Sequence, residues 1–411
     1  MHDNLRFLRG VVTMKTLKAT ALAAALVSAS MPASSIVIGG DQDGWELSFS
    51  GTINLFMNFY DVEGGDKEVH LQEGLLPAFA TFKAKSPEMN GMTSTAQISF
   101  APDSSNSKIR REDKGGSAVD IREVFLDIEG DFGTFSAGRT LGIFSRQAYL
   151  KGQSLYGVGA GAATDGGGTT LGRIAHGYVF PAFDTRFSYK TPDMNGFQLE
   201  VGLYDPLEGN EGDGSTWQTG TPRVETELVY GTSFAGDGNL NFWLGGLWQD
   251  SEDVTNTFAA GGMRDLTHWG VDVGAQATLN GFELLGHYTK GENLGQKFKI
   301  ATPVFGLEDT EEEHWYAQAG YTFAERTKVA FSYGESEQED NGVNAINDLW
   351  TVGVYHDIAP WLKVAAEYND TENVVDNTNG ATFIDENGNL ALVPGTDVEA
   401  QVFSVGAFVF W

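Results

Sequence analysis

Few residues in this sequence have the types and spacing that catalysis requires. The seven histidines form no His-Glu-x-x-His pair, which would place two zinc ligands on one face of a helix. No Gly-x-Ser-x-Gly segment, the turn that exposes a nucleophilic serine, is present. His268 and His287 could face a common interior, but nothing in the sequence marks a partner serine for either of them. We therefore expect no catalytic residue.

Two segments match cofactor or metal loops only in part. Gly157 to Gly161 alternates glycine with small residues but lacks the strand and helix that flank a dinucleotide site. Asp385 to Asn389 is similar to a calcium loop, except that its glycine comes two positions early. The absence of cysteine excludes disulfides and Cys-based metal sites. We expect no cofactor and no metal.

The N-terminus has the pattern of a secretory signal peptide. Lys15 and Lys18 precede an apolar run from Ala19 to Val27, and small residues follow up to Ser35. This run is too short to span a bilayer as a helix, which takes about 20 residues. The chain is therefore expected to leave the cytoplasm.

We expect translation to start at Met14 and residues 1–35 to form the signal, with cleavage somewhere in residues 29–35. Residues 36–411 then form the mature domain, whose net charge is −33 once four basic residues and one acidic residue are removed. Such a charge repels nucleic acid and favours cations. No later apolar stretch approaches the length of a membrane-spanning helix. A soluble periplasmic protein and an outer-membrane barrel both remain possible.

Alternation with a period of two decides between these possibilities. From Leu47 to Phe59 nearly every odd position is apolar, whereas the even positions are mostly polar. A strand directs alternate side chains to opposite faces, so this segment has one apolar and one polar face. It is long enough to cross a membrane as a tilted strand of about ten residues. The same pattern recurs up to the C-terminus.

The connections alternate between short turns and long polar loops. Asn280-Gly281 is the strongest turn signal. The short turns are Pro87–Gly91, Glu129–Asp131, Pro192–Gly196, Ala235–Asn239, Asn280–Gly281, Ala324–Arg326 and Ala359–Trp361. The long loops are Asp61–Leu75, Pro102–Ser117, Thr140–Phe183, Asp205–Thr221, Ser251–Asp265, Gly291–Glu311, Gln338–Ile346 and Asn373–Asp397. Together they predict a sixteen-stranded, antiparallel, up-and-down transmembrane β-barrel.

Aromatic residues gather near both ends of the expected strands. Near the short turns lie Phe197, Phe234, Phe282, Phe323, Trp361 and Trp411, and toward the long loops lie Trp248, Tyr288, Trp315, Tyr333, Trp350 and Tyr368. Amphipathic rings prefer the headgroup level of a bilayer, so two such rows indicate two membrane interfaces. A soluble β-sandwich would instead need an apolar core shared by two sheets.

Four segments resemble the general porin family of Gram-negative outer membranes. They are Asp120 to Ile128 (DIREVFLDI), Phe132 to Arg139 (FGTFSAGR), Tyr189 to Phe197 (YKTPDMNGF) and Phe403 to Trp411 (FSVGAFVFW). The resemblance extends from Trp45 to Trp411. It implies an outer-membrane homotrimer of barrels with short periplasmic turns, in which the long third loop, residues 140–183, folds into the lumen and narrows it.

The resemblance also assigns roles to charged residues. It implies a basic wall at the constriction, for which alternation offers Lys83, Lys85, Arg186 and Lys190. The family's wall arginine matches Arg122, although alternation alone puts Arg122 on the outer face with Val124. Arg139 is expected to anchor the third loop. The loop itself carries the charges Arg146, Lys151, Asp165 and Arg173, which are less acidic than is usual in the family.

Acidic residues on the later strands predict the sign of the selectivity. Glu200, Glu225, Glu227, Asp272, Glu283 and Glu367 are expected to line the lumen. With acidic outer loops, they should give a mild cation preference that fades as salt shortens the Debye length to about 3 Å at 1 M. The C-terminal strand resembles the signal read by the barrel-insertion machinery, with Phe403, Val405, Val409 and Trp411 on its outer face.

The expected function is passive diffusion of small hydrophilic solutes and ions through a water-filled channel. A channel selective for one solute, or a structural or adhesive barrel with a blocked lumen, remains an alternative. Polar inward positions on nearly every strand favour an open lumen. The expected partners are outer-membrane lipids, lipopolysaccharide and the insertion machinery, and nucleic acid is excluded.

Overall fold

The structure is a computed structural model that describes most of residues 36–411. The described residues are 36–40, 44–102, 119–161, 169–206, 215–234, 236–256, 264–294, 310–340, 342–377, 382–384, 390–392 and 395–411. The expected signal peptide and Asp165 lie outside them. Within these ranges, no helix combines the length and the apolar character needed to cross a membrane.

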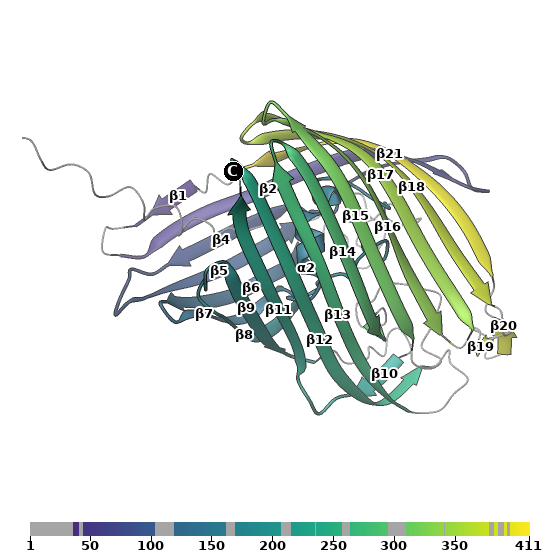
Figure 1. The fold of residues 1–411 in the computed structure, drawn as a ribbon, viewed down its shortest axis with the longest axis horizontal. Coiled ribbons are helices and arrows are strands. Elements are labelled where there is room, and N and C mark those ends of the chain that lie inside the picture. The colour runs from purple at the N-terminus through teal and green to yellow at the C-terminus, as the bar shows by residue number, and fades with distance from the viewer. Residues whose placement is uncertain are drawn as a thin grey trace, which may run out of the picture. The chain divides into compact units, whose positions relative to one another are not determined.

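Sixteen antiparallel strands close into a barrel (Figure 1), which confirms the expected fold. The strands are β2 (Glu46–Val62), β4 (Phe79–Lys85), β5 (Met92–Pro102), β6 (Val119–Gly130), β7 (Gly133–Leu141), β8 (Phe183–Lys190), β9 (Phe197–Tyr204), β11 (Arg223–Phe234), β12 (Gly238–Asn256), β13 (Arg264–Leu279), β14 (Phe282–Glu292), β15 (Glu311–Phe323), β16 (Thr327–Asp340), β17 (Val343–Ala359), β18 (Leu362–Asn377) and β21 (Thr396–Phe410). Each pairs with its sequence neighbour, and β21 also pairs with β2, so the sheet has no free edge.

Among the described residues, five short strands lie outside this count. β1 (Ile36–Gly39) and β3 (Glu68–Gln72) pair with β2, and β10 (Ser215–Gln218) pairs with β12. β19 (Thr382–Ile384) and β20 (Leu390–Leu392) pair with each other.

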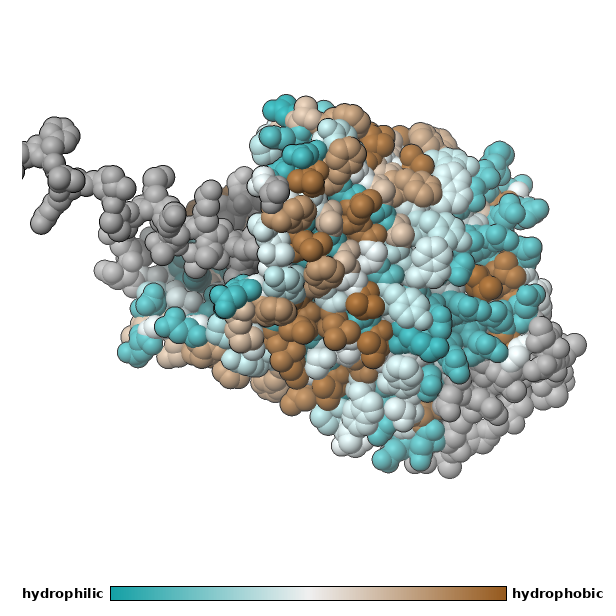
Figure 2. Space-filling view, in the orientation of Figure 1, coloured by the Kyte–Doolittle hydropathy of each residue, from teal (hydrophilic) through white to brown (hydrophobic). Residues whose placement is uncertain are grey.

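The side chains of β2 show why the strands form a barrel wall. Ile53, Leu55, Met57 and Phe59 are exposed on the outer face, whereas the intervening Asn54 and Asn58 are buried inside. This inverted arrangement suits a strand whose outer face meets hydrocarbon. Figure 2 shows the apolar side chains gathered over the middle of the strands, with polar ones toward the end that carries the long loops.

The seven short turns lie where the sequence predicts them, except that Ala235, in the turn before β12, is outside the described residues. Asn280 and Gly281 have φ values of 50° and 84°, the two positive angles that a type I′ hairpin requires. The expected aromatic rows also face outward. Phe197, Phe282, Phe323 and Trp361 are exposed near the short turns, and the ring pairs Trp315–Tyr333 and Trp350–Tyr368 lie toward the long loops at 5.1 Å and 5.3 Å.

The long loops are shorter than expected because several strands continue into them. Gln338–Ile346 was expected to be a loop, but β16 reaches Asp340 and β17 begins at Val343. Asp61–Leu75 contains β3, and most of Ser251–Asp265 belongs to β12 and β13. Polar residues beyond the membrane still form the hydrogen bonds between strands. Strand ends predicted from the start of a polar segment were therefore placed too early. The segment 103–118 lies outside the described residues.

Strand length varies around the barrel and positions the third loop. β7 and β8 have nine and eight residues, whereas β12 and β17 have 19 and 17. A loop that leaves the end of a short strand starts lower than the ends of the longer strands elsewhere in the barrel. The third loop therefore enters the lumen below the rim.

Candidate functional site

The third loop runs through the lumen between Leu141 and Phe183. It contains the helix α2 (Arg146–Lys151) and a 3-10 turn, η2 (Gln153–Tyr156). Ser145, just before α2, has a φ of 65°, which turns the chain sharply. Most side chains of α2 and η2 are buried against the wall. This part of the loop is thus packed against the barrel wall.

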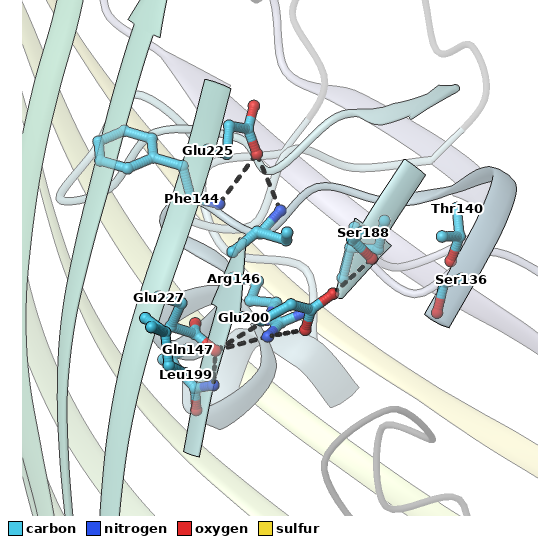
Figure 3. Close-up of polar contacts among 12 residues, drawn as sticks. Ser136, Thr140, Phe144, Arg146, Gln147, Ser188, Leu199, Glu200, Glu225 and Glu227 are labelled. Atoms are coloured by element: carbon cyan, nitrogen blue, oxygen red, sulfur yellow. Dashed lines mark hydrogen bonds and ion pairs between the residues drawn. The ribbon is translucent and has the colours of Figure 1, made fainter. Parts of the chain in front are cut away.

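Two wall carboxylates bind the backbone at the start of the loop. Glu225 accepts hydrogen bonds from the amides of Ile143 (2.9 Å) and Phe144 (3.0 Å), and Asp272 accepts one from Ser145 (2.9 Å). Figure 3 shows Glu225 pointing at this backbone. Charge-assisted bonds of this kind are about twice as strong as neutral ones. The carboxylates therefore hold the loop in place.

Arg146 attaches α2 to the neighbouring strands. Its Nη2 donates to Glu200 on β9 at 2.8 Å and to Glu227 on β11 at 2.6 Å (Figure 3). Gln147 also donates to Glu227 at 3.0 Å. On the other side Glu200 meets Arg186 at 3.4 Å. All these charges are buried, so each relies on its partner.

The middle of the loop is fastened to the opposite part of the barrel. The amide of Gln153 donates to Gln318 of β15 at 2.7 Å. The amides of Val158 and Gly159 donate to Glu367 of β18 at 2.7 Å and 3.0 Å. A side chain at Gly157 would overlap the Glu367 carboxylate, so glycine is needed for this approach.

Arg173 secures the returning half of the loop. Its guanidinium is completely buried and donates to the Leu349 carbonyl (2.8 Å), to Ser332 Oγ (2.7 Å) and to Thr351 Oγ1 (2.9 Å). It also lies over the Tyr316 ring at 5.0 Å. These partners belong to β15, β16 and β17, so one side chain joins the loop to three strands.

Apolar packing fills the space between the loop and this part of the wall. Phe144 and Val179 of the loop pack with Leu247 and Leu294, and Val229, Trp243, Leu285 and Tyr316 form a second cluster. The interior was expected to be polar on nearly every strand. The structure differs because inward apolar residues pack beneath the third loop, where no water needs to pass.

Most of the carboxylates expected to line an open lumen are covered by the third loop. Glu200, Glu225, Glu227, Asp272 and Glu367 do face inward, but they are buried beneath the third loop and bonded to it. Glu283 is partly exposed and pairs with Lys328 at 2.7 Å. These six carboxylates therefore do not attract cations in open water as expected, because loop amides or Arg146 bind five of them and Lys328 pairs with Glu283.

The basic residues are spread along the wall. Arg186 is buried and donates to the Leu141 carbonyl at 2.5 Å, at the root of the third loop. Lys190 faces inward beside Glu200 in the β8–β9 register. Lys83 and Lys85 are exposed near the short-turn end of β4. Arg122 lies against Phe183, with its Cζ 5.5 Å from the ring. Of these, only Arg122 and Arg186 are near the third loop.

Arg139 does not anchor the third loop. It is exposed and lies between Val124 and Thr185 in the ladder, both of which are exposed on the outer face. Gly138 and Thr140 face the interior instead, so the direction of a β-strand places Arg139 outside. Arg173, Arg146 and the carboxylates perform the anchoring expected of it.

Burial shifts the pKa values of three side chains in the third loop. Burial lowers the pKa of Lys151, which lies near Glu227 and Glu283. Burial also lowers the pKa of His176, so this ring is neutral at pH 7. Tyr149 lies near Arg122, and burial raises its pKa to about 12, which keeps the hydroxyl protonated.

One pair missed from the sequence resembles a catalytic couple. Ser251 lies 3.0 Å from His268 Nε2, while Nδ1 of the ring faces the Asn293 carbonyl at 2.8 Å. Both Ser251 and His268 are buried. A nucleophile must reach its substrate, so this pair is better explained as part of the wall packing.

The inward faces of the wall divide into two parts. We call β4 to β8 the open wall, since it retains exposed or partly exposed inward residues: Thr81, Lys83, Gln97, Arg122, Glu123, Asp127, Ser136 and Lys190. We call β11 to β18 the covered wall, since Val229, Trp243, Asp272, Tyr316, Leu349 and Glu367 are buried there. Accessible inward side chains need water beside them. The arrangement leaves a polar passage along the open wall.

Replacing Arg173 by methionine should free the returning half of the loop. The substitution removes hydrogen bonds from a charged donor, each worth about 1.5–3 kcal/mol, and leaves the Leu349 carbonyl without its donor. Hydrogen exchange should then be faster at residues 172–178, while the barrel ladders stay protected. Arg139→Met, on the outer face, serves as the matched control. Equal protection in both variants would contradict the anchoring role.

Comparison with known proteins agrees with this architecture. A family model described as Gram-negative porin matches residues 19–376. The chain belongs to the Gram-negative porin family. Together with the closed sixteen-stranded barrel, this places the porin in the outer membrane as a multi-pass β-barrel. No curated protein matches the sequence significantly.

Solved porin-like structures share the fold of this porin. The outer membrane channel DcaP of Acinetobacter baumannii is 13% identical, with a TM-score of 0.63 over 92% of this chain and 100% of that one. An anion-selective porin from Comamonas acidovorans is 14% identical, with a TM-score of 0.59 over 89% and 100%. OmpT, an outer membrane protein of Vibrio cholerae, is 18% identical, with a TM-score of 0.56 over 91% and 99%. At these identities the likeness establishes the fold alone.

Proposed function

We propose that this porin forms a water-filled channel for passive diffusion of small hydrophilic solutes and ions. The observation that carries the proposal is the contrast between the two parts of the wall. Inward polar residues stay accessible on the open wall, whereas the third loop covers the other side. Passage then runs between the open wall and α2. No covalent step is involved, so the porin is not proposed to be an enzyme.

The alternative of a blocked structural barrel accounts less well for the open wall. A plugged lumen would bury inward charges and pair them with counter-charges. Instead, Lys83 and Lys85 are exposed, and Gln97, Glu123 and Asp127 are partly exposed. A solute-selective channel remains compatible with the same passage, and its selectivity would arise from these residues.

The assembly proposed for this porin follows its family. One solved OmpT structure is described as a trimer form. We propose a homotrimer in the outer membrane, in contact with lipopolysaccharide and inserted by the barrel-insertion machinery. Residues 1–35 would act as the export signal, with translation from Met14.

Excising Tyr156 to Gly172 should test whether the loop sets the pore size. The excised part carries the contacts to Glu367 and lies between α2 and the return through Arg173. Single-channel conductance should rise, and larger sugars should enter liposomes in a swelling assay. A folded variant with the wild-type exclusion limit would show that the loop does not limit the pore. A wild-type protein that passes neither ions nor arabinose would contradict the channel itself.

A further inference from the structure

A β-bulge interrupts the regular alternation of β6 at Arg122. Ser99 of β5 pairs with Glu123, and the next residue, Phe100, pairs with Ile121, so Arg122 is the extra residue of the ladder. Ile121 and Val124 are both exposed on the outer face. Two consecutive residues between them, Arg122 and Glu123, must therefore turn inward together. Bulges re-aim side chains in this way and occur frequently next to functional sites.

The bulge resolves the conflict over Arg122. Strict alternation put Arg122 outside with Val124, because the extra residue is not visible in the sequence. In the structure Arg122 lies beside Phe183, at the end of the third loop, and its side chain is 16% exposed. Its Nε donates to Asp120 at 2.9 Å. Within the described part of the chain, its two terminal nitrogens have no hydrogen-bond acceptor.

Glu123 offers the opposite charge from the next position. Its Oε2 accepts hydrogen bonds from Gln97 and Ser99, each at 2.8 Å, and its Oε1 accepts one from Thr140 at 3.0 Å. All three donors are neutral. No cation pairs with this carboxylate among the described residues. The donors hold Glu123 in one orientation without cancelling its charge.

We propose that Arg122 and Glu123 form a bipolar recognition site on the open wall that favours small zwitterions, such as free amino acids, over neutral solutes of the same size. The terminal nitrogens of Arg122 receive the carboxylate of the solute, and Glu123 receives its ammonium group. Charge-assisted bonds to preoriented groups discriminate between solutes even where water is present. This inference rests on the proposed channel function, since the solute must pass along the open wall.

The two charges can be separated by single substitutions. The probes are glutamine, a zwitterion, and arabinose, a neutral sugar of similar mass, and their entry rates are compared by liposome swelling. Arg122→Gln and Glu123→Gln should each lower the glutamine-to-arabinose ratio, by about two- to fivefold, the range expected for partly exposed ion pairs. Glu88→Gln, in an exposed short turn, is the matched control.

Ion selectivity distinguishes a bipolar site from a simple effect of net charge. Under a salt gradient the reversal potential should shift toward cations in Arg122→Gln and toward anions in Glu123→Gln. Opposite shifts combined with the same loss of glutamine preference support the proposal. The proposal is overturned if the glutamine-to-arabinose ratio rises in one variant and falls in the other, as an effect of net charge would require. It is also overturned if the ratio stays unchanged in both folded variants. If arabinose fails to enter with the wild type, the channel function itself is wrong.

Discussion

Replacing Arg146 by methionine should widen the channel more than any other single substitution in the loop. Arg146 joins Glu200 and Glu227, and its loss leaves the buried Glu227 without its counter-charge and Glu200 with Arg186 alone. Breaking a buried ion pair costs about 3–5 kcal/mol, or a shift on the order of 100-fold or more in the local equilibrium. The helix α2 should detach from the neighbouring strands. Single-channel recordings should show larger and noisier conductance.

A second substitution distinguishes the loss of the loop attachment from the effect of an unpaired buried carboxylate. In Arg146→Met with Glu227→Gln, Gln147 remains 3.0 Å from the new amide, and Glu200 keeps Arg186 and Ser188. This double variant should recover much of the wild-type conductance. Strand ladders are untouched in both, so both should run as folded barrels in unheated gel samples. A single variant with wild-type conductance and noise would show that Arg146 does not hold the loop.

Replacing Trp411 by aspartate should sharply reduce the amount of folded porin in the outer membrane. Trp411 exchanges two backbone hydrogen bonds with Gly51, at 2.9 Å and 3.1 Å, where β21 meets β2 and the barrel closes. Its indole also covers Gly51 and lies 5.8 Å from the Phe49 ring. Losing this apolar contact costs about 2 kcal/mol at the closing seam.

The measurement is the folded fraction recovered from the outer membrane. Trp411→Phe keeps an aromatic ring and should insert nearly normally. Phe323→Asp makes the same kind of change in an outward aromatic away from the seam, and it should impair insertion less. If both aspartate variants insert equally well, Trp411 has no special part in closure or in recognition by the insertion machinery.

The selectivity expected from the sequence changes with the structure. With residues 1–35 removed, as we expect, the net charge would still favour cations at the mouths. Inside, however, Glu225 and Asp272 bind loop amides, and Glu200 and Glu227 bind Arg146. On the covered wall, the partly exposed Glu283 is paired with Lys328. On the open wall, the accessible Lys83 and Lys190 accompany Glu123 and Asp127. Both signs are present there, which suits the proposed preference for zwitterions.

Local patterns determined the barrel because they depend on each strand alone. The alternation from Leu47 to Phe59, the Asn280-Gly281 turn and the aromatic rows each reflect one strand and its surroundings. Strand ends were less predictable, as at Gln338–Ile346, since ladder hydrogen bonds continue through polar residues in water.

The sequence by itself determined the barrel, its membrane-facing surface and the inward direction of the acidic residues. Only the tertiary structure decided what those residues do, because the loop amides that bind Glu225 and Asp272 lie 81 to 127 positions away in the chain. The same holds for Arg173, whose guanidinium donates hydrogen bonds to residues 159 to 178 positions away. The bulge at Arg122 depends on the register between β5 and β6, and a register is a property of two strands that neither shows alone.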